Sequence, residues 1–468
     1  MIFSNILIIY LISLSNFVNI ILMLALKIVG LVLLILSYII MMSIMIIFER
    51  DKPKNIILWS IIFLFTSVVG YIIYIISRTI FCKKKKSLKI KQEEDEIYLN
   101  LIDKEIFKND VKTSDDLYVF NNMAYDAKLT SNNNIELINS YAKFKDNLIK
   151  ELQSAEKYII FEVVYVNSKD FDRIKSILIS KASANVNVKF VYDSIISPKL
   201  RKELKKGGVK VYRFSKHNTI GKVYSNKRNF VVIDGRVAFM CNLNVRSREL
   251  SGKFDIADTI IKFKGDVVQE LDITAHQDVI SASGKYLDYK APPKEAFANE
   301  CNIQYISNEI DTDIELLLIK AICMAKKSIQ LQLEQFIPTE SIMSLLKFAI
   351  NSNIDVRLMV PLKTNMHSKY YASRAYAKEL ALFGANVYLY DGFIKFNAVT
   401  IDGKYVIFGS FILDREHVST ALQNAVVIED ERAVNYFNKT FDEDIENSYR
   451  ISNAKLMLLR EKFFKNFV

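Results

Sequence analysis

The sequence predicts an α/β protein made of two pseudo-symmetric lobes, each a mixed sheet flanked by helices, preceded by an N-terminal transmembrane helical segment. The chain has 468 residues, of which 51% are hydrophobic, and the longest apolar runs all lie before residue 82. After residue 134, amphipathic helical patterns alternate with short apolar runs that are typical of buried strands. This alternation occurs twice, at an offset of about 170 residues, which indicates an internal duplication.

The N-terminal segment, residues 1–81, contains three apolar runs, at 2–26, 28–48 and 56–76. A helix needs about 20 apolar residues to cross a bilayer, so we expect two to three membrane-spanning helices. The number is two if the first run lies in the interface. The segment has no basic start and no small-residue cleavage site, which argues against a cleaved signal peptide.

Lysines set the expected orientation of the chain. Six of them lie between Lys83 and Lys91, directly after the last apolar run. Because positive charge accumulates on the cytoplasmic side of membrane proteins, we expect a multi-pass protein of the bacterial cell membrane with a cytoplasmic body. The same lysines are suited to contact anionic lipid headgroups.

We expect a linker and lead-in at 82–134, a first lobe at 135–295 and a second lobe at 296–468. Each lobe begins with a helix, at 135–157 and 313–327, followed by an apolar strand, at 158–166 and 328–338. Each also contains a strand hairpin that turns at Asp-Gly, at 230–244 and 398–414. Two similar lobes usually meet around a pseudo-twofold axis, where one shared site can form.

Charge and cysteine content restrict the class of partner. The net charge of +11 fits anionic lipid or another phosphate-bearing partner. The four cysteines have no ligand spacing, so we expect no zinc site and no disulfide framework. No nucleotide-binding fingerprint or metal-ligand cluster is present, and we expect neither a cofactor nor a nucleic-acid partner.

The two hairpins share the motif K-x-N-x4-D-G. Its residues are Lys227, Asn229 and Asp234 in the first lobe, and Lys395, Asn397 and Asp402 in the second.

With this motif and the phrases EQFIP (334–338), YYASRAYAKEL (370–380) and DGFIKFNAVTIDG (391–403), the chain resembles the bacterial cardiolipin synthases of the phospholipase D superfamily. The resemblance extends over about residues 45–450. It implies phospholipase-D-like lobes and a phosphatidyltransferase that condenses two phosphatidylglycerols to cardiolipin and glycerol. The resemblance further implies the motif H-x-K-x4-D, in which one histidine attacks phosphorus and the other protonates the leaving alcohol.

This chain departs from that motif in both lobes. Lysine (Lys227, Lys395) stands at the histidine positions and asparagine (Asn229, Asn397) at the lysine positions. Beyond the motifs, Asn244 and Ser410 match polar residues of the family, whereas Ile412 and Gln423 do not match. A free lysine, with a pKa of about 10.4, is protonated and not nucleophilic at neutral pH.

Two interpretations of the degenerate motifs follow. Lys227, Asn229, Asn244, Lys395, Asn397 and Ser410 can form a pocket for a phosphate or lipid headgroup. Alternatively, Lys227–Asp234 and Lys395–Asp402 are buried ion pairs left from an active site. We therefore expect a catalytically silent relative that binds phospholipid headgroups, an active synthase partner or a second copy of itself. The alternative is an active cardiolipin synthase.

Three further residues are weaker candidates. His417 follows the second motif but has no partner histidine in the sequence, and His367 lies in a polar stretch before YYASR. Glu162, within a predicted strand, either faces the shared site or lies at a sheet edge.

Overall fold

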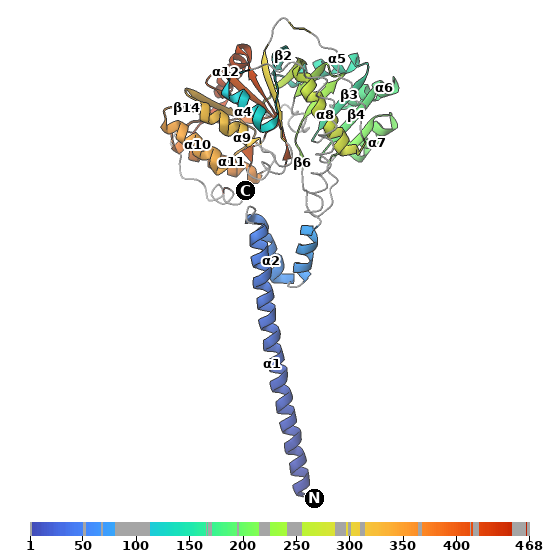
Figure 1. The fold of residues 1–468 in the computed structure, drawn as a ribbon, viewed down its shortest axis with the longest axis vertical. Helices are drawn as coiled ribbons and strands as arrows, with labels where there is room; N and C mark the ends of the chain where they lie inside the picture. Colours follow the sequence, from blue (N-terminus) through green and yellow to red (C-terminus); the bar gives the residue numbers. More distant parts are fainter. Residues whose placement is uncertain are drawn as a thin grey trace. The chain divides into compact units, whose positions relative to one another are not determined.

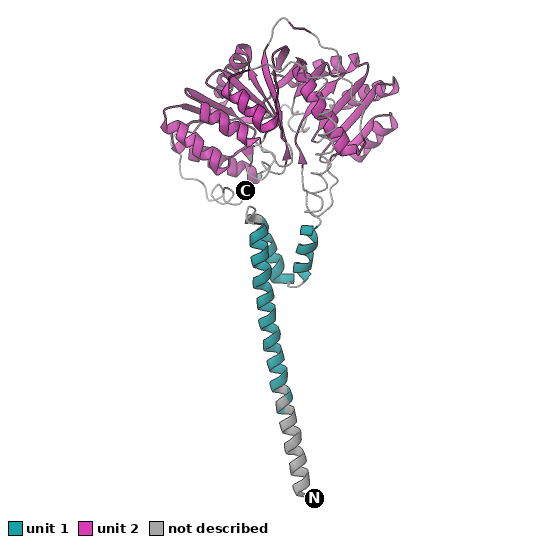
Figure 2. Ribbon diagram, viewed as in Figure 1, with its two compact units in different colours: residues 1–85 teal, residues 86–468 magenta. Residues whose placement is uncertain are grey.

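The computed structural model describes most of the chain. The described residues are 2–49, 53–66, 69–79, 113–164, 166, 171–193, 196–214, 225–240, 255–285, 296–297, 301–308, 314–363, 367–411, 413–414, 421–451 and 465. They form two compact units, residues 1–85 and residues 86–468 (Figure 2).

The first unit is helical. It contains α1 (Ile2–Phe48), α2 (Pro53–Thr66) and a short apolar helix at Val69–Thr79. The apolar runs 2–26 and 28–48, expected as separate spans, form one continuous helix, and the run 56–76 is divided between two short helices. Within the described residues, one helix, Ile21–Phe48, is long and apolar enough to cross a membrane. The expected multi-pass arrangement is therefore not supported.

The first lobe of the second unit is built on a seven-stranded sheet of order β2-β10-β8-β7-β3-β4-β5. Its strands are β2 (Asn133–Ile138), β3 (Tyr158–Val163), β4 (Asn187–Tyr192), β5 (Lys210–Arg213), β7 (Phe230–Ile233), β8 (Val237–Met240) and β10 (Ile260–Gly265). The helices α5 (Tyr141–Ser154), α6 (Phe171–Ser183) and α7 (Pro198–Lys206) pack on this sheet (Figure 1).

The second lobe is built on a nine-stranded sheet of order β1-β11-β21-β18-β17-β12-β14-β15-β22. Its strands are β1 (Leu129–Thr130), β11 (Asn302–Ser307), β12 (Ser328–Gln332), β14 (Asp355–Pro361), β15 (Asn386–Tyr390), β17 (Asn397–Ile401), β18 (Tyr405–Gly409), β21 (Asn424–Glu429) and β22 (Ser448–Arg450). Its helices are α4 (Asp116–Tyr125), α9 (Glu315–Met324), α10 (Glu340–Asn351) and α11 (His367–Leu382). The remaining short pair, β13 (Phe336–Ile337) with β19 (Leu413–Asp414), lies beside α11.

The two sheets repeat one topology. From β11 to β15, the second sheet has the same order of seven strands as the first, with the same parallel and antiparallel pairings. β1 and β22 are added at its two edges. The mixed sheets flanked by helices agree with the predicted fold class, whereas the lobe boundaries at 135–295 and 296–468 remain predictions.

One predicted helix is partly wrong. The stretch 135–157 begins as strand β2, and the helix α5 starts only at Tyr141. The residues of β2 pair with β10 over its full length, so the sheet edge determines their conformation. Tertiary pairing here overrides a local pattern that continues smoothly into the helix.

The seam between the lobes is made by two helices and two exchanged strand pairs. α8 (Val267–Ser283) and α12 (Glu431–Glu446) contribute to an apolar core that draws buried residues from both sheets, such as Phe230 and Phe408. β6 (Ser225–Asn226) of the first lobe pairs with β20 (Ala421–Leu422) of the second. Conversely, β16 (Gly392–Ile394) of the second lobe pairs with β9 (Asp255–Ala257) of the first. β6 directly precedes Lys227 of the first motif, and β16 directly precedes Lys395 of the second.

Candidate functional site

The exchanged strand pairs place the two motif lysines in equivalent positions at the seam. The Lys227 amide donates to the Leu422 carbonyl over 2.8 Å, and the Lys395 amide donates to the Ala257 carbonyl over 2.9 Å. Each lysine is therefore fixed through its backbone to the opposite lobe. The structure thus brings the lysines predicted from the repeated motif to the interface that a shared site requires.

The second motif lysine is buried beside a carboxylate. Lys395 is 4% exposed, and its Nζ lies 3.8 Å from Glu334 Oε1. Its ammonium group also lies 5.7 Å from the centre of the Phe393 ring. Lys395 therefore lies in a mostly desolvated position, beside a carboxylate and an aromatic face.

Both motif asparagines bond to the main chain. Asn229 Oδ1 accepts the Val164 amide over 3.1 Å, and Asn397 Oδ1 accepts the Glu334 amide over 2.9 Å. Val164 and Glu334 hold equivalent places, just after the central strands β3 and β12. The Asn229 Nδ2 group also donates to the Lys227 carbonyl. The carboxamides therefore connect the motif strand to its neighbour, and their oxygens are already occupied.

The motif aspartates lie at the opposite ends of the same strands, in turns where Asp234 has φ 53° and Asp402 has φ 54°. Asp234 accepts three backbone amides, from Glu156, Lys157 and Tyr158, each over 2.8 Å. It also pairs with Arg236 over 3.2 Å.

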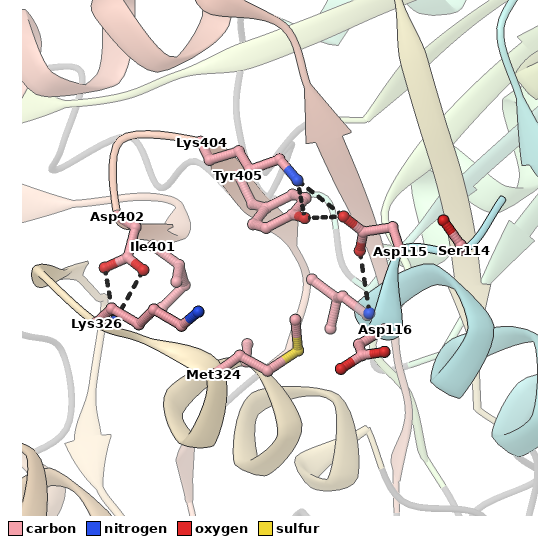
Figure 3. A pocket seen from close by; sticks show the side chains of 11 residues that line it. Ser114, Asp115, Asp116, Met324, Lys326, Ile401, Asp402, Lys404 and Tyr405 are labelled. Atoms are coloured by element: carbon pink, nitrogen blue, oxygen red, sulfur yellow. Dashed lines mark hydrogen bonds and ion pairs between the residues drawn. The ribbon is translucent and has the colours of Figure 1, made fainter.

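Asp402 has the same role in the second lobe. It accepts the amides of Lys326, Lys327 and Ser328 over 2.7 to 3.1 Å. Figure 3 shows the two bonds from Lys326. The expected ion pairs Lys227–Asp234 and Lys395–Asp402 are therefore wrong. A strand of four or five residues, at about 3.3 Å per residue, separates each lysine from its aspartate.

A surface pocket of about 350 Å³ lies at this aspartate end of the second lobe (Figure 3). Asp115, Lys326, Asp402, Lys404 and Tyr405 are among its lining residues, and Lys404 pairs with Asp115 over 2.8 Å. Because Asp402 and Lys395 are at opposite ends of β17, the pocket is separate from the seam.

A buried polar network lies at the seam beside the first motif. Arg228, 4% exposed, donates to both oxygens of Asp278, over 2.8 and 3.0 Å, and to the Asn308 carbonyl over 2.6 Å. Asn226 Nδ2 donates to Glu162 Oε1 over 2.7 Å and to Asp278 Oδ2 over 3.0 Å. Of these residues, Glu162 alone is a candidate from the sequence. It faces the seam from β3, which is central in its sheet, so the edge interpretation is wrong.

One cation faces two carboxyl groups in this network. Burial, and then the nearby charge of Asp278, raise the pKa of Glu162 well above its usual value. This shift favours the neutral form of Glu162. Arg228 is thus paired with Asp278, while Glu162 accepts its hydrogen bond from Asn226.

The second lobe has a reduced version of this network. Gln332 holds the strand position equivalent to Glu162, since both pair with the motif strand and with the next parallel strand in the same register. Gln332 Nε2 donates to Asp444 Oδ2 over 2.6 Å. Burial raises the pKa of Asp444 to about 6. Phe396, one residue after Lys395, replaces the arginine that follows Lys227, so the two sides of the seam differ in charge.

The other sequence candidates are placed only in part. Ser410 Oγ donates to Asn424 Oδ1 over 2.7 Å and accepts the Asn424 amide over 3.0 Å. His367 is the first residue of α11. Asn244, Ile412 and His417 lie outside the described residues. Among the residues that the structure describes, no group of three or more His, Cys, Asp or Glu is arranged to hold a metal ion.

The family model and the relatives that match this chain share one description, cardiolipin synthase. The family model described as "Cardiolipin synthase, PLD-like domain" matches residues 318–445. A probable cardiolipin synthase of Bacillus subtilis strain 168 is 28% identical over 426 residues, which cover 87% of this chain and 85% of that protein. The cardiolipin synthase of Listeria innocua is 29% identical over 451 residues, which cover 90% of this chain and 93% of that protein.

A solved structure shows the same fold. The phosphatidylserine synthase of Haemophilus influenzae Rd KW20 superposes with a TM-score of 0.53 and 12% sequence identity, covering 71% of this chain and 92% of that chain. At this identity the likeness concerns the fold alone.

Proposed function

This chain is a relative of the cardiolipin synthases of the phospholipase D superfamily, and we propose that it binds anionic phospholipid headgroups at its seam without transferring phosphatidyl groups. The observation that carries the proposal is the pair of lysines at the two histidine positions, each fixed to the opposite lobe by a backbone hydrogen bond. Two ammonium groups at a buried interface provide a binding site for a phosphodiester.

The same geometry argues against catalysis. Attack on phosphorus requires a neutral nucleophile, whereas a free lysine, with a pKa of about 10.4, is protonated at neutral pH. In this chain Lys395 moreover has Glu334 as an ion-pair partner 3.8 Å away. The developing charge on a pentavalent phosphoryl group would need cations at the motif-lysine positions. Asn229 and Asn397 stand there instead, and their oxygens are bonded to backbone amides.

We further propose that the chain is attached to the bacterial cell membrane through α1 and that its body lies on the cytoplasmic side. The apolar helix Ile21–Phe48 supports the attachment, and the lysines after residue 82 support the orientation. This attachment would keep the body at the membrane that carries its lipid ligand. Association with an active synthase or with a second copy of the chain is part of the same proposal, since a silent relative can act through a partner.

A titration tests headgroup binding. The full chain, solubilised in detergent, is titrated with short-chain phosphatidylglycerol and, separately, with short-chain phosphatidylcholine in a calorimeter. We expect preference for the anionic lipid and, in the double variant Lys227→Ala/Lys395→Ala, a loss of about 10- to 100-fold. That range corresponds to the roughly 1.5–3 kcal/mol of one hydrogen bond to a charged group.

The matched control carries two exposed lysines changed instead, Lys150→Ala and Lys199→Ala, which removes the same charge from the surface. Equal affinity in the seam variant and in this control would reject the seam as the binding site.

A second candidate is the active cardiolipin synthase, and the comparisons favour it. Both curated relatives named above are cardiolipin synthases or probable ones, and both align over at least 85% of their own length. Cardiolipin made by the purified chain, and lost in the Lys227→Ala/Lys395→Ala variant, would establish this candidate over the silent one.

A further inference from the structure

The first unit ends in an antiparallel helical hairpin. α2 and the helix Val69–Thr79 contact each other through aromatic side chains, with ring centroids 5.1 Å apart for Trp59–Tyr74 and 5.0 Å apart for Phe63–Tyr71. Phe63 lies after Trp59 in α2, whereas its partner Tyr71 lies before Tyr74 in the second helix. The two helices are therefore antiparallel. Gly70 permits the close approach, because a methyl group there would lie 2.4 Å from Thr66 Oγ1.

At the open end of this hairpin, polar side chains from the start of α2 and from the end of the second helix bond to the end of α1. Glu49, 6% exposed, pairs with Arg78 over 3.0 Å and accepts Asn55 Nδ2 over 2.9 Å. Arg78 also donates to the Phe48 carbonyl over 3.3 Å. The start of α2, the end of the second helix and the end of α1 therefore lie together.

The hairpin is apolar but too short to cross a bilayer. Its helices Asn55–Thr66 and Val69–Thr79 contain 12 and 11 residues, about 18 and 16 Å at 1.5 Å per residue. The hydrocarbon core is about 30 Å thick. At the closed end, Leu64 is 69% exposed, Phe65 81% and Val69 60%. Exposed apolar side chains thus predominate among the described residues of the closed end, where Thr66 bonds to its own helix, and the groups of Glu49, Asn55 and Arg78 lie at the open end.

We infer that this hairpin is re-entrant: it enters one leaflet and returns to the same face, while α1 alone crosses the membrane. This inference rests on the proposed membrane attachment. The uncharged stretch 28–48 of α1 has 21 residues, about 32 Å of helix, and so matches the core, with Lys27 at one face and Glu49 at the other. The polar cluster of Glu49, Asn55 and Arg78 then lies at the membrane interface.

Three arrangements of residues 54–79 compete: a third span, a hairpin on the membrane surface and a re-entrant hairpin. They differ in where the start of α2, the closed end and the end of the second helix lie relative to the membrane. A continuous third span would place the two open ends of the hairpin on opposite faces. A hairpin lying on the surface would leave its closed end in water. The re-entrant arrangement places both open ends on one face and the closed end in hydrocarbon.

Site-directed labelling of the full chain in bacterial cells separates these arrangements. In a chain whose four cysteines are replaced, single variants Lys27→Cys, Lys54→Cys, Phe65→Cys and Thr79→Cys react with a membrane-impermeant maleimide before and after permeabilisation. We expect positions 54 and 79 to label from the same side, position 27 from the other side, and position 65 from neither. A protease site inserted after the same residues of the native chain gives an independent readout if the cysteine-free chain misfolds.

Each other result overturns the inference. Labelling of 54 and 79 from opposite sides means a third span, and labelling of 65 from either side means a surface or spanning hairpin. Labelling of 27 from the same side as 54 means that α1 does not cross. Recovery of the chain in the soluble fraction after a carbonate wash would instead overturn the membrane attachment on which the inference rests.

Discussion

Changing Asp234 to asparagine tests whether the surviving motif aspartates are structural. The carboxylate of Asp234 is 3% exposed and accepts three backbone amides, each over 2.8 Å, at the start of the central strand β3. Asparagine is nearly isosteric and tolerates the left-handed backbone of this position, so the variant removes the charge and one acceptor oxygen while keeping the shape of the side chain. It also leaves the lysines of the seam untouched.

The expected cost follows from the bonds that change. The amides of Lys157 and Tyr158 keep an acceptor, but it becomes a neutral oxygen. Hydrogen bonds to charged groups contribute about 1.5–3 kcal/mol and neutral ones about 0.5–1.5 kcal/mol, so each of these two bonds becomes weaker by about 1 kcal/mol. The third amide, that of Glu156, would face an NH2 group and lose its acceptor, at roughly 1 kcal/mol or more. The free energy of unfolding should therefore fall by about 3 kcal/mol.

Urea unfolding of the detergent-solubilised chain measures this change. With a slope of roughly 3 kcal/mol per M, the midpoint should fall by about 1 M. The matched control, Asp146→Asn on the exposed face of α5, should change stability by less than about 0.5 kcal/mol. Unchanged stability together with lost lipid binding in Asp234→Asn would refute the structural role and assign the aspartate to the site.

Three further predictions concern the buried network at the seam. Glu162→Gln should change stability by less than about 1 kcal/mol, since glutamine already holds the equivalent position in the second lobe and the raised pKa of Glu162 favours its neutral form; a loss of several kcal/mol in urea unfolding would contradict this equivalence. Arg228→Met should cost about 3–5 kcal/mol, because it leaves the buried Asp278 without its cation, and Arg228→Met/Asp278→Asn should recover part of that loss; an equal loss in the double variant would argue against charge pairing. Asp444 should contribute a decrease in stability as pH rises from about 4 to about 6, because its pKa is raised to about 6 in the folded chain and the folded state therefore keeps this proton longer than the unfolded one; Asp444→Asn should remove that contribution, and an unchanged pH dependence of stability would mean that Asp444 does not make it.

The repeated elements were predictable because each carries a complete local signal. The helix and strand at 341–361 appear as α10 and β14, and both Asp-Gly turns have the left-handed backbone that such hairpins require. The placement of the two motif lysines at one seam also followed from the repeat. In these parts of the chain, local sequence preference and tertiary structure agree.

Other features depend on contacts that no local pattern encodes. The sequence shows Arg228 beside Lys227, but the partners Asp278 and Asn308 lie 50 and 80 residues away. The aspartates were expected beside their lysines, although a strand separates the two ends of the motif. In the membrane segment, residues 56–76 form one apolar run in the sequence, and hydropathy alone does not show that this run is divided between two antiparallel helices.

The central claim is that the seam binds phospholipid without turnover, and the most direct test is chemical. The purified full chain in detergent is incubated with isotope-labelled phosphatidylglycerol, and mass spectrometry follows the lipid, cardiolipin and free glycerol. We predict that phosphatidylglycerol is recovered unchanged, and that less of it remains bound to the Lys227→Ala/Lys395→Ala variant. Formation of cardiolipin and an equal amount of glycerol, abolished in that variant, would contradict the claim and show that the lysine-bearing site is catalytic.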